Sequence, residues 1–214
     1  ADYIIIANPD IHVTSRCIER VKQALDNTEG AVMASARVTD PQGKDLFSYW
    51  TLLPLWKDLL DTGLITRRLF KDMLNTPPYR LPNAGDEGSR LVDAVPGSFF
   101  MLKPGLLTPQ DIEGLFDSRI FLYYEEKVLG RKFQEMGLKT VLVTDESYVH
   151  AHSATIDKSL KRMVDKQRLL HQSKLYYYRE YLHAGPALMA AAGVALDIIL
   201  AEVWFLTVVC RMRW

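Results

Sequence analysis

Hydrophobic and polar positions along the chain follow two periods, one typical of strands and one typical of helices. An unbroken apolar run of β-branched character predicts a strand at Tyr3–Ala7, covered on both faces, and a second strand is predicted at Ala31–Val38. Between these runs, apolar residues recur every three or four positions from Ser15 to about Thr28, which predicts a helix with one buried face. The order strand, helix, strand predicts parallel strands joined by a right-handed crossover.

The later elements follow from the same periods. We predict strands at 91–95, 98–102, 139–144 and 147–150, and helices at 54–61, 66–74, 109–115, 125–136 and 157–182. Residues 76–89 hold three prolines and two glycines, which predicts a long exposed loop. Together the elements predict an α/β fold: a mixed, mostly parallel sheet flanked by helices over residues 1–154, followed by a C-terminal helical extension over residues 155–214.

Polar residues stand where several of these strands end. Asn8 and Asp10 follow the first strand, on either side of a proline, and His150 ends the last strand. Ligands of open α/β sheets bind outside the carboxyl ends of the strands, which makes these three side chains candidate ligand contacts. Asn-Pro-Asp also suits a simple turn, and a lone surface histidine often has no function, so the pattern by itself leaves both interpretations open.

Two adjacent acids, Glu125 and Glu126, stand at the junction between an aromatic, strand-like run and the helix predicted at 125–136. The helix dipole stabilises acids in the first turn, so charge complementation is one interpretation. The other is general-base catalysis, because burial against the preceding aromatic side chains would raise the pKa of a carboxylate towards neutrality.

The 214-residue chain carries 26 Lys and Arg against 26 Asp and Glu, but this balanced charge is unevenly spread. Residues up to Ala154 hold 17 basic and 21 acidic side chains, and the remainder holds 9 and 5. The basic tail suits an anionic phospholipid surface and contains no nucleic-acid-binding motif, so we expect a membrane surface and no nucleic acid as partner. Two distant cysteines, Cys17 and Cys210, and the lack of a signal peptide favour a reducing, cytoplasmic setting.

The segment Ala187–Cys210 is nearly all apolar and has the length of a bilayer span. Asp197 and Glu202 near its middle would be costly in lipid, and Arg211 and Arg213 beyond it oppose the positive-inside preference. We therefore expect an interfacial or re-entrant helix, or a helix buried in a homo-oligomer, rather than a true span.

Four motifs, in this order, resemble those of the family 2 glycosyltransferases, which are inverting enzymes with a GT-A fold, and especially the bacterial polysaccharide and rhamnosyltransferase-like members. The motifs are Ile4–Asp10, Val92–Met101, Phe116–Leu129 and Thr140–His150. The resemblance implies that residues 1–154 are the later, metal and acceptor side of a GT-A catalytic domain. Its nucleotide-binding half would precede Ala1, so we expect the isolated chain to be inactive.

By the same resemblance, Asp10 is a ligand of a divalent cation, Mn²⁺ or Mg²⁺, that bridges the diphosphate of a nucleotide-sugar donor, and His150 is a second metal ligand. Asn8 and the Gly97–Ser98 segment are the other donor-site residues that the resemblance implies. The cation would offset the negative charge that develops on the departing nucleotide.

The resemblance makes Glu126 the general base that deprotonates the acceptor hydroxyl, with Glu125 able to share the role. The family has Asp at the position of Glu126 and often another Asp two residues later, where this chain has Val128. The extra methylene of Glu126 shifts the base by about 1 Å, a displacement that affects the rate of such reactions.

These features together predict a hexosyl- or rhamnosyltransferase that acts on a glycan or lipid-linked acceptor in cell-surface polysaccharide synthesis. We expect it in the cytoplasm, attached peripherally to the inner face of the membrane through the C-terminal helices. Two alternatives remain at this stage: a catalytically silent, membrane-docked assembly partner and, more distantly, a metal-dependent hydrolase built on the same acids and histidine.

Overall fold

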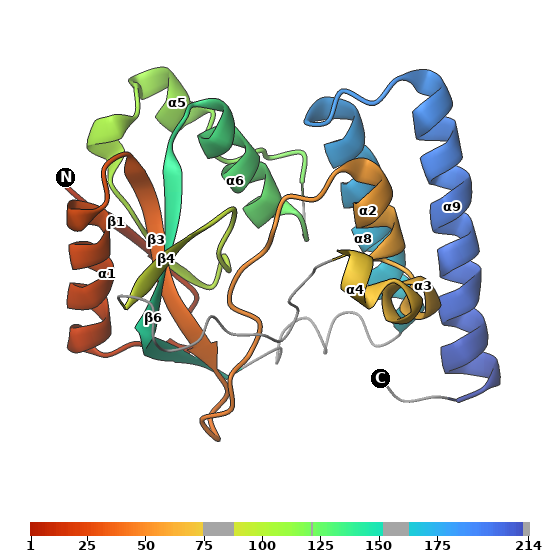
Figure 1. Ribbon diagram of the computed structural model, residues 1–214, viewed down its shortest axis with the longest axis horizontal. Helices are drawn as coiled ribbons and strands as arrows, with labels where there is room; N and C mark the ends of the chain where they lie inside the picture. The colour runs from red at the N-terminus through yellow and green to blue at the C-terminus, as the bar shows by residue number, and fades with distance from the viewer. Residues whose placement is uncertain (75–87, 121, 152–162, 212–214) are drawn as a thin grey trace. The chain divides into compact units, whose positions relative to one another are not determined.

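The computed structural model describes residues 1–74, 88–120, 122–151 and 163–211 (Figure 1). The chain forms two compact units. Unit 1 consists of Ala1–Leu52, Pro77–Asp117 and Glu125–His152, and unit 2 consists of Leu53–Thr76, Ser118–Tyr124 and Ser153–Trp214. Unit 2 thus contains the predicted helical extension and two earlier segments that the sequence analysis placed with the catalytic portion.

Unit 1 is built on an open, six-stranded sheet. In spatial order the strands are β1 (Ile4–Ala7), β5 (Phe99–Leu102), β3 (Ala31–Thr39), β6 (Lys139–His150) and β2 (Ile11–His12), and β4 (Ser89–Val92) also pairs with β6. The pair β3 and β6 is parallel, and the other four described pairings are antiparallel. The predicted mixed α/β architecture is therefore confirmed.

The prediction of a mostly parallel sheet is wrong for the strands that the structure describes. β5 lies between β1 and β3 and is antiparallel to both, so β1 and β3 run in the same direction without pairing. Strands covered on both faces have the same apolar composition in either orientation, so an unbroken apolar run does not reveal the direction of its neighbour.

The sheet has one apolar core on each face, because successive side chains of a strand point to opposite sides. On one face α1 (Ser15–Asn27), which contains the fully buried Cys17, packs on Phe99, Met101, Val141 and Val143. On the other face α6 (Glu125–Glu135) packs on Phe100, Leu102 and Leu142. Figure 1 shows α1 and α6 on opposite sides of the strands. The α5 helix (Pro109–Glu113) and a 3₁₀ turn (Pro104–Leu106) complete the described helices of this unit.

The first strand differs from its prediction in burial. β1 pairs with β5 alone, and its residues Ile4 and Ile5 are 40% and 46% exposed. The sequence predicted cover on both faces because the run is continuously apolar. β1 is the outermost strand of the sheet, which explains the difference. No other described element pairs with its outer side or covers the whole of either face of the strand.

Unit 2 is helical in its described parts. It consists of α2 (Leu55–Leu60), α3 (Leu64–Leu69), α4 (Lys71–Leu74), α8 (Met163–Glu180) and α9 (Pro186–Trp204), which continues into a π-helical turn (Phe205–Val209). Proline at the first position of α9 is favoured there because its missing N–H would have no partner. The apolar contacts of this unit centre on Leu196, Ile199 and Val203.

Most predicted elements match the structure within a few residues at each end. The strands predicted at 139–144 and 147–150 are one continuous strand, β6. The start of the helix predicted from residue 157 and nearly all of the loop predicted at 76–89 lie outside the described residues.

Candidate active site

One edge of the sheet carries most of the predicted site residues. β1 and β6 end at this edge, and β5, which is antiparallel to β1, begins there. The backbone N–H of Asn8 donates to the Ser98 carbonyl at 2.8 Å, and β2 pairs Ile11 with His150. The strand pairings therefore bring together the segments after β1, before β5 and at the end of β6.

Asp10 and His150 lie next to each other at this edge. The Asp10 Oδ1 atom is 3.4 Å from His150 Nε2, and the Ala151 N–H donates to the Asp10 carbonyl at 3.1 Å. The two side chains are 38% and 13% exposed, so the pair is open to solvent on the carboxylate side. Over the described ranges, no group of three or more His, Cys, Asp or Glu could hold a metal ion. The pair by itself thus offers one oxygen and one nitrogen ligand.

Glu126 occupies the first turn of α6 and reaches the same edge. The Gly97 N–H donates to Glu126 Oε1 at 3.3 Å. One turn later, Gly130 has no side chain, and a Cβ atom there would lie 2.2 Å from the Asp93 carbonyl oxygen. The missing side chain therefore lets α6 approach the chain segment before β5 and sets the position of Glu126.

Both acids of the pair have raised pKa values. Burial, followed by the neighbouring Glu125 carboxylate, raises the pKa of Glu126 from 4.5 to about 7. Burial also raises the pKa of Glu125, whose buried Oε2 atom has no hydrogen-bond partner among the described residues. Because the two adjacent carboxyl groups influence each other, a proton on one disfavours ionisation of the other less than a negative charge would.

Tyr148 is a site residue that the sequence analysis missed. Its hydroxyl lies 2.7 Å from Ser98 Oγ, its side chain is 1% exposed, and burial raises its pKa. Its partner Ser98 follows Gly97, whose N–H donates to Glu126 Oε1. Tyr148 precedes His150 by two residues on β6 and so lies on the same side of the strand. Strand periodicity was the signal for it.

The two residues before Glu125 have an unusual backbone. Tyr123 and Tyr124 have φ values of 66° and 74°, which lie in the left-handed region of backbone conformation. Residues other than glycine rarely adopt it. Such a conformation costs about 1–3 kcal/mol per residue and persists where surrounding contacts fix it. Both tyrosines belong to unit 2, and the contacts that hold Tyr124 are found there.

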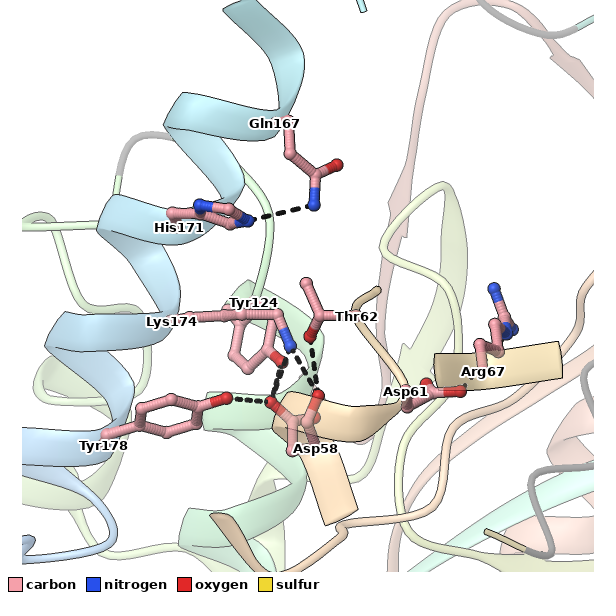
Figure 2. Close-up of polar contacts among 9 residues, drawn as sticks. All are labelled: Asp58, Asp61, Thr62, Arg67, Tyr124, Gln167, His171, Lys174 and Tyr178. Carbon is pink, nitrogen blue, oxygen red and sulfur yellow. Dashed lines mark hydrogen bonds and ion pairs between the residues drawn. The ribbon is translucent and has the colours of Figure 1, made fainter. Parts of the chain in front are cut away.

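A buried polar cluster within unit 2 supplies those contacts. Figure 2 shows Tyr124, Lys174 and Tyr178 converging on the Asp58 carboxylate. Lys174 Nζ donates to Asp58 Oδ2 at 2.7 Å and Tyr178 Oη donates to it at 2.6 Å, while Tyr124 Oη donates to the same oxygen. Asp58 and Lys174 are 2% and 4% exposed. Burial, followed by the nearby Asp58 carboxylate, raises the pKa of both tyrosines, so they remain donors.

No protein-family model and no curated protein matches this chain. The family assignment therefore stays a prediction from the four motifs.

Proposed function

We propose that unit 1 is the acceptor side of a GT-A-like catalytic domain and that the protein is an inverting glycosyltransferase. The observation that carries the proposal is Glu126, a carboxyl group with a pKa of about 7, held against the Gly97 N–H at a strand-end edge that also carries Asp10 and His150. A base with this pKa is well matched to deprotonating a hydroxyl group near neutral pH.

In the proposed reaction, ionised Glu126 accepts the proton of an acceptor hydroxyl as that oxygen attacks the anomeric carbon of the donor sugar. A new carbon–oxygen bond forms, the bond to the diphosphate breaks on the opposite face, and the configuration at the anomeric carbon inverts. The Gly97 N–H supports the ionised form of Glu126 by hydrogen bonding. Glu125 lies beside the base, and its buried, unpaired oxygen can accept the proton in turn.

The proposal includes a divalent cation, Mn²⁺ or Mg²⁺, held by Asp10 and His150. The donor set fits in part: a carboxylate oxygen and an imidazole nitrogen 3.4 Å apart are ligands that Mn²⁺ accepts, with Mg²⁺ requiring mostly oxygen. Two protein ligands leave positions for diphosphate oxygens and water. Such a cation, when bound, offsets the charge of the departing nucleoside diphosphate.

The substrates follow from the same proposal. The donor is a nucleotide sugar of the hexosyl or rhamnosyl class, and Asn8, Gly97 and Ser98 border its site. The acceptor is a glycan or a lipid-linked glycan used in cell-surface polysaccharide synthesis. A lipid-linked acceptor is consistent with a cytoplasmic enzyme attached to the inner face of the membrane, with a homo-oligomer as a further form of the protein.

The test uses protein that contains the whole catalytic domain and a panel of nucleotide sugars, with release of nucleoside diphosphate as the readout. Glu126→Gln should lower kcat about 10²–10⁴-fold, which is the usual contribution of a general base. The matched control is Glu135→Gln, an exposed acid at the other end of α6, which should leave kcat unchanged. In the wild type, kcat/KM should rise with pH and level off above about 7, the pKa of Glu126.

A chelator should abolish transfer and added Mn²⁺ should restore it, with a higher Mn²⁺ requirement in Asp10→Asn. The assigned roles are rejected if Glu126→Gln and Asp10→Asn turn over at the wild-type rate. Metal-independent transfer that still needs Glu126 would reject the cation alone.

A further inference from the structure

Helices α3 and α4 expose apolar side chains between basic ones. We call this the α3–α4 surface and define it by Ile65, Leu69, Phe70 and Met73, together with Arg67, Arg68 and Lys71. The four apolar residues are 50%, 72%, 41% and 43% exposed. On short helices this arrangement is typical of segments that lie in the interface of a bilayer, where apolar side chains enter the lipid and basic ones stay at the headgroups.

The basic residues of this segment indicate that its partner is negatively charged. Residues 64–74 contain three basic residues and one acid, and Arg68 and Lys71 are exposed. Arg67 forms an ion pair with Asp61 at 3.2 Å, so its charge is partly offset and the lipid contacts are assigned to Arg68 and Lys71. Exposed basic residues next to apolar ones complement the phosphates of anionic phospholipids, and each contributes to binding at low ionic strength.

The α3 helix is fixed to α9 at its N-terminus. No side chain of the preceding residues caps α3, and the Ile65 N–H instead donates to Glu202 Oε1 on α9 at 2.7 Å. This hydrogen bond also gives a partner to Glu202, one of the two acids in the apolar segment. The other, Asp197, is close enough to His171 to influence its pKa. Both acids of α9 thus interact with other groups of unit 2.

The neighbouring helix α9 also exposes apolar side chains. Pro186–Val209 is long and apolar enough to cross a membrane, with a mean hydropathy of 2.0. Ile198, Phe205 and Val208 remain 64%, 52% and 52% exposed. The opposite side of α9 is occupied by the Leu196, Ile199 and Val203 core and by the Glu202 contact, so α9 uses one side within unit 2 and leaves an apolar side uncovered by the described residues.

We propose that the α3–α4 surface, with the exposed side of α9, docks on a bilayer that contains anionic phospholipid. The apolar side chains enter the boundary between headgroups and acyl chains, and Arg68 and Lys71 contact lipid phosphates. Unit 2 then binds the membrane through two segments far apart in the sequence, α3–α4 and α9. The charge and hydropathy of the chain pointed to the C-terminal segment alone. This surface acts independently of sugar transfer.

Co-sedimentation of the full chain with vesicles tests the proposal. Vesicles of phosphatidylcholine alone and with phosphatidylglycerol form the two lipid arms. Leu69→Glu with Phe70→Glu should lower binding to both, by about tenfold or more, because it removes two inserted side chains and adds charge. Arg68→Gln with Lys71→Gln should weaken binding to the anionic vesicles alone, by about fivefold per basic residue at low salt.

The matched controls lie in unit 1. Ile112→Glu in α5 replaces another exposed apolar residue, 44% exposed, and Lys44→Gln removes another exposed charge, so both should bind vesicles like the wild type. Far-ultraviolet circular dichroism verifies that each variant retains its helices. Unchanged vesicle binding of the Leu69/Phe70 variant overturns the proposal. So does conversion of a dimer to a monomer by that variant with vesicle binding intact, since the surface would then pack against a second copy of the chain.

Discussion

The two units place their polar and apolar side chains differently. In unit 1 the buried polar residues within the described ranges carry hydroxyl groups: Ser35, Thr39, Ser48, Ser98, Thr140 and Thr144. In unit 2 they include an acid, a base and an imidazole: Asp58, Lys174, His171, Gln167 and Ser173. Most of the exposed large apolar side chains, in contrast, belong to unit 2.

The difference separates two uses of ionisable groups. Unit 1 is held by apolar cores on both faces of its sheet, and its ionisable groups Asp10, Glu126 and His150 stand at a strand-end edge, outside those cores. Unit 2 has a small apolar core and uses Asp58 and Lys174 inside it as structural contacts. The following changes test whether this contrast determines stability and activity.

The largest expected effect comes from breaking the buried pair of unit 2. Asp58→Ala removes the acceptor of three hydrogen bonds and leaves the Lys174 ammonium buried without its carboxylate, so we expect a loss of about 3–5 kcal/mol in unfolding free energy. Urea denaturation gives the magnitude. Hydrogen exchange should show the loss first in α2 and α8.

The double variant Asp58→Leu with Lys174→Met serves as the control for this change. It removes both charges together and should be considerably more stable than Asp58→Ala, because no unpaired charge stays buried. A single-variant loss below about 1 kcal/mol would show that the cluster does not hold unit 2.

The second effect is a pH dependence of opposite sign in the two units. Burial lowers the pKa of His171 from 6.5 to about 4, so the folded protein keeps it neutral and loses stability as the pH falls from 6.5 towards 4. Burial raises the pKa of Glu126 from 4.5 to about 7, so the folded protein keeps its proton longer than the unfolded chain and loses stability as the pH rises through that range.

Each contribution should amount to at most about 3.5 kcal/mol, because one pKa unit corresponds to about 1.4 kcal/mol. His171→Gln should remove the loss on the acid side and Glu126→Gln the loss on the neutral side. Unfolding free energies measured from pH 4 to pH 8 test both. Identical pH profiles in the wild type and both variants would contradict the prediction.

The smallest effect compares two helix glycines. Gly130→Ala in α6 puts a Cβ atom against the Asp93 carbonyl and should cost about 1–3 kcal/mol, along with part of the transfer activity, because it displaces the helix that carries Glu126. Gly193→Ala in α9 has no atom within 4 Å of the new Cβ and should stabilise by about 0.5–1 kcal/mol. Equal effects of the two changes on the thermal midpoint would contradict the role given to Gly130.

Hydrophobic periodicity predicted the helices and strands of this protein better than it predicted which elements lie next to each other. The helix predicted from Ser15 to about Thr28 is α1, since apolar spacing on one face directly encodes a buried helix. Strand direction and the edge position of β1 were not predictable in this way, because both depend on which strand becomes the neighbour. Pairing of β5 between β1 and β3 is a long-range event that no local pattern contains.

The candidate site shows the same limit. Asp10, Glu126 and His150 were singled out as candidates because strand ends and helix starts are marked by local sequence, and the structure places all three at one end of the sheet. Tyr148 was missed because a tyrosine in a buried strand has the same sequence pattern as a core residue. Gly130 was missed because glycine is required there by the close approach of the Asp93 carbonyl, which is distant in the sequence. Asp58 lies in a short helix, where an acid normally faces water, and its partner Lys174 is more than a hundred residues away.

The two cysteines of the chain differ in how they would react with a thiol reagent. Cys17 is fully buried on the face of α1 that packs on the sheet, and burial raises its thiol pKa to about 12, whereas Cys210 is exposed beyond the end of α9. A maleimide fluorophore added to the native protein should therefore label Cys210 alone, because the reactive thiolate form of Cys17 is suppressed. Modification of Cys17 then reports opening of the sheet unit, and the dye on Cys210 reports the environment of the apolar helix, in one molecule without any engineered residue.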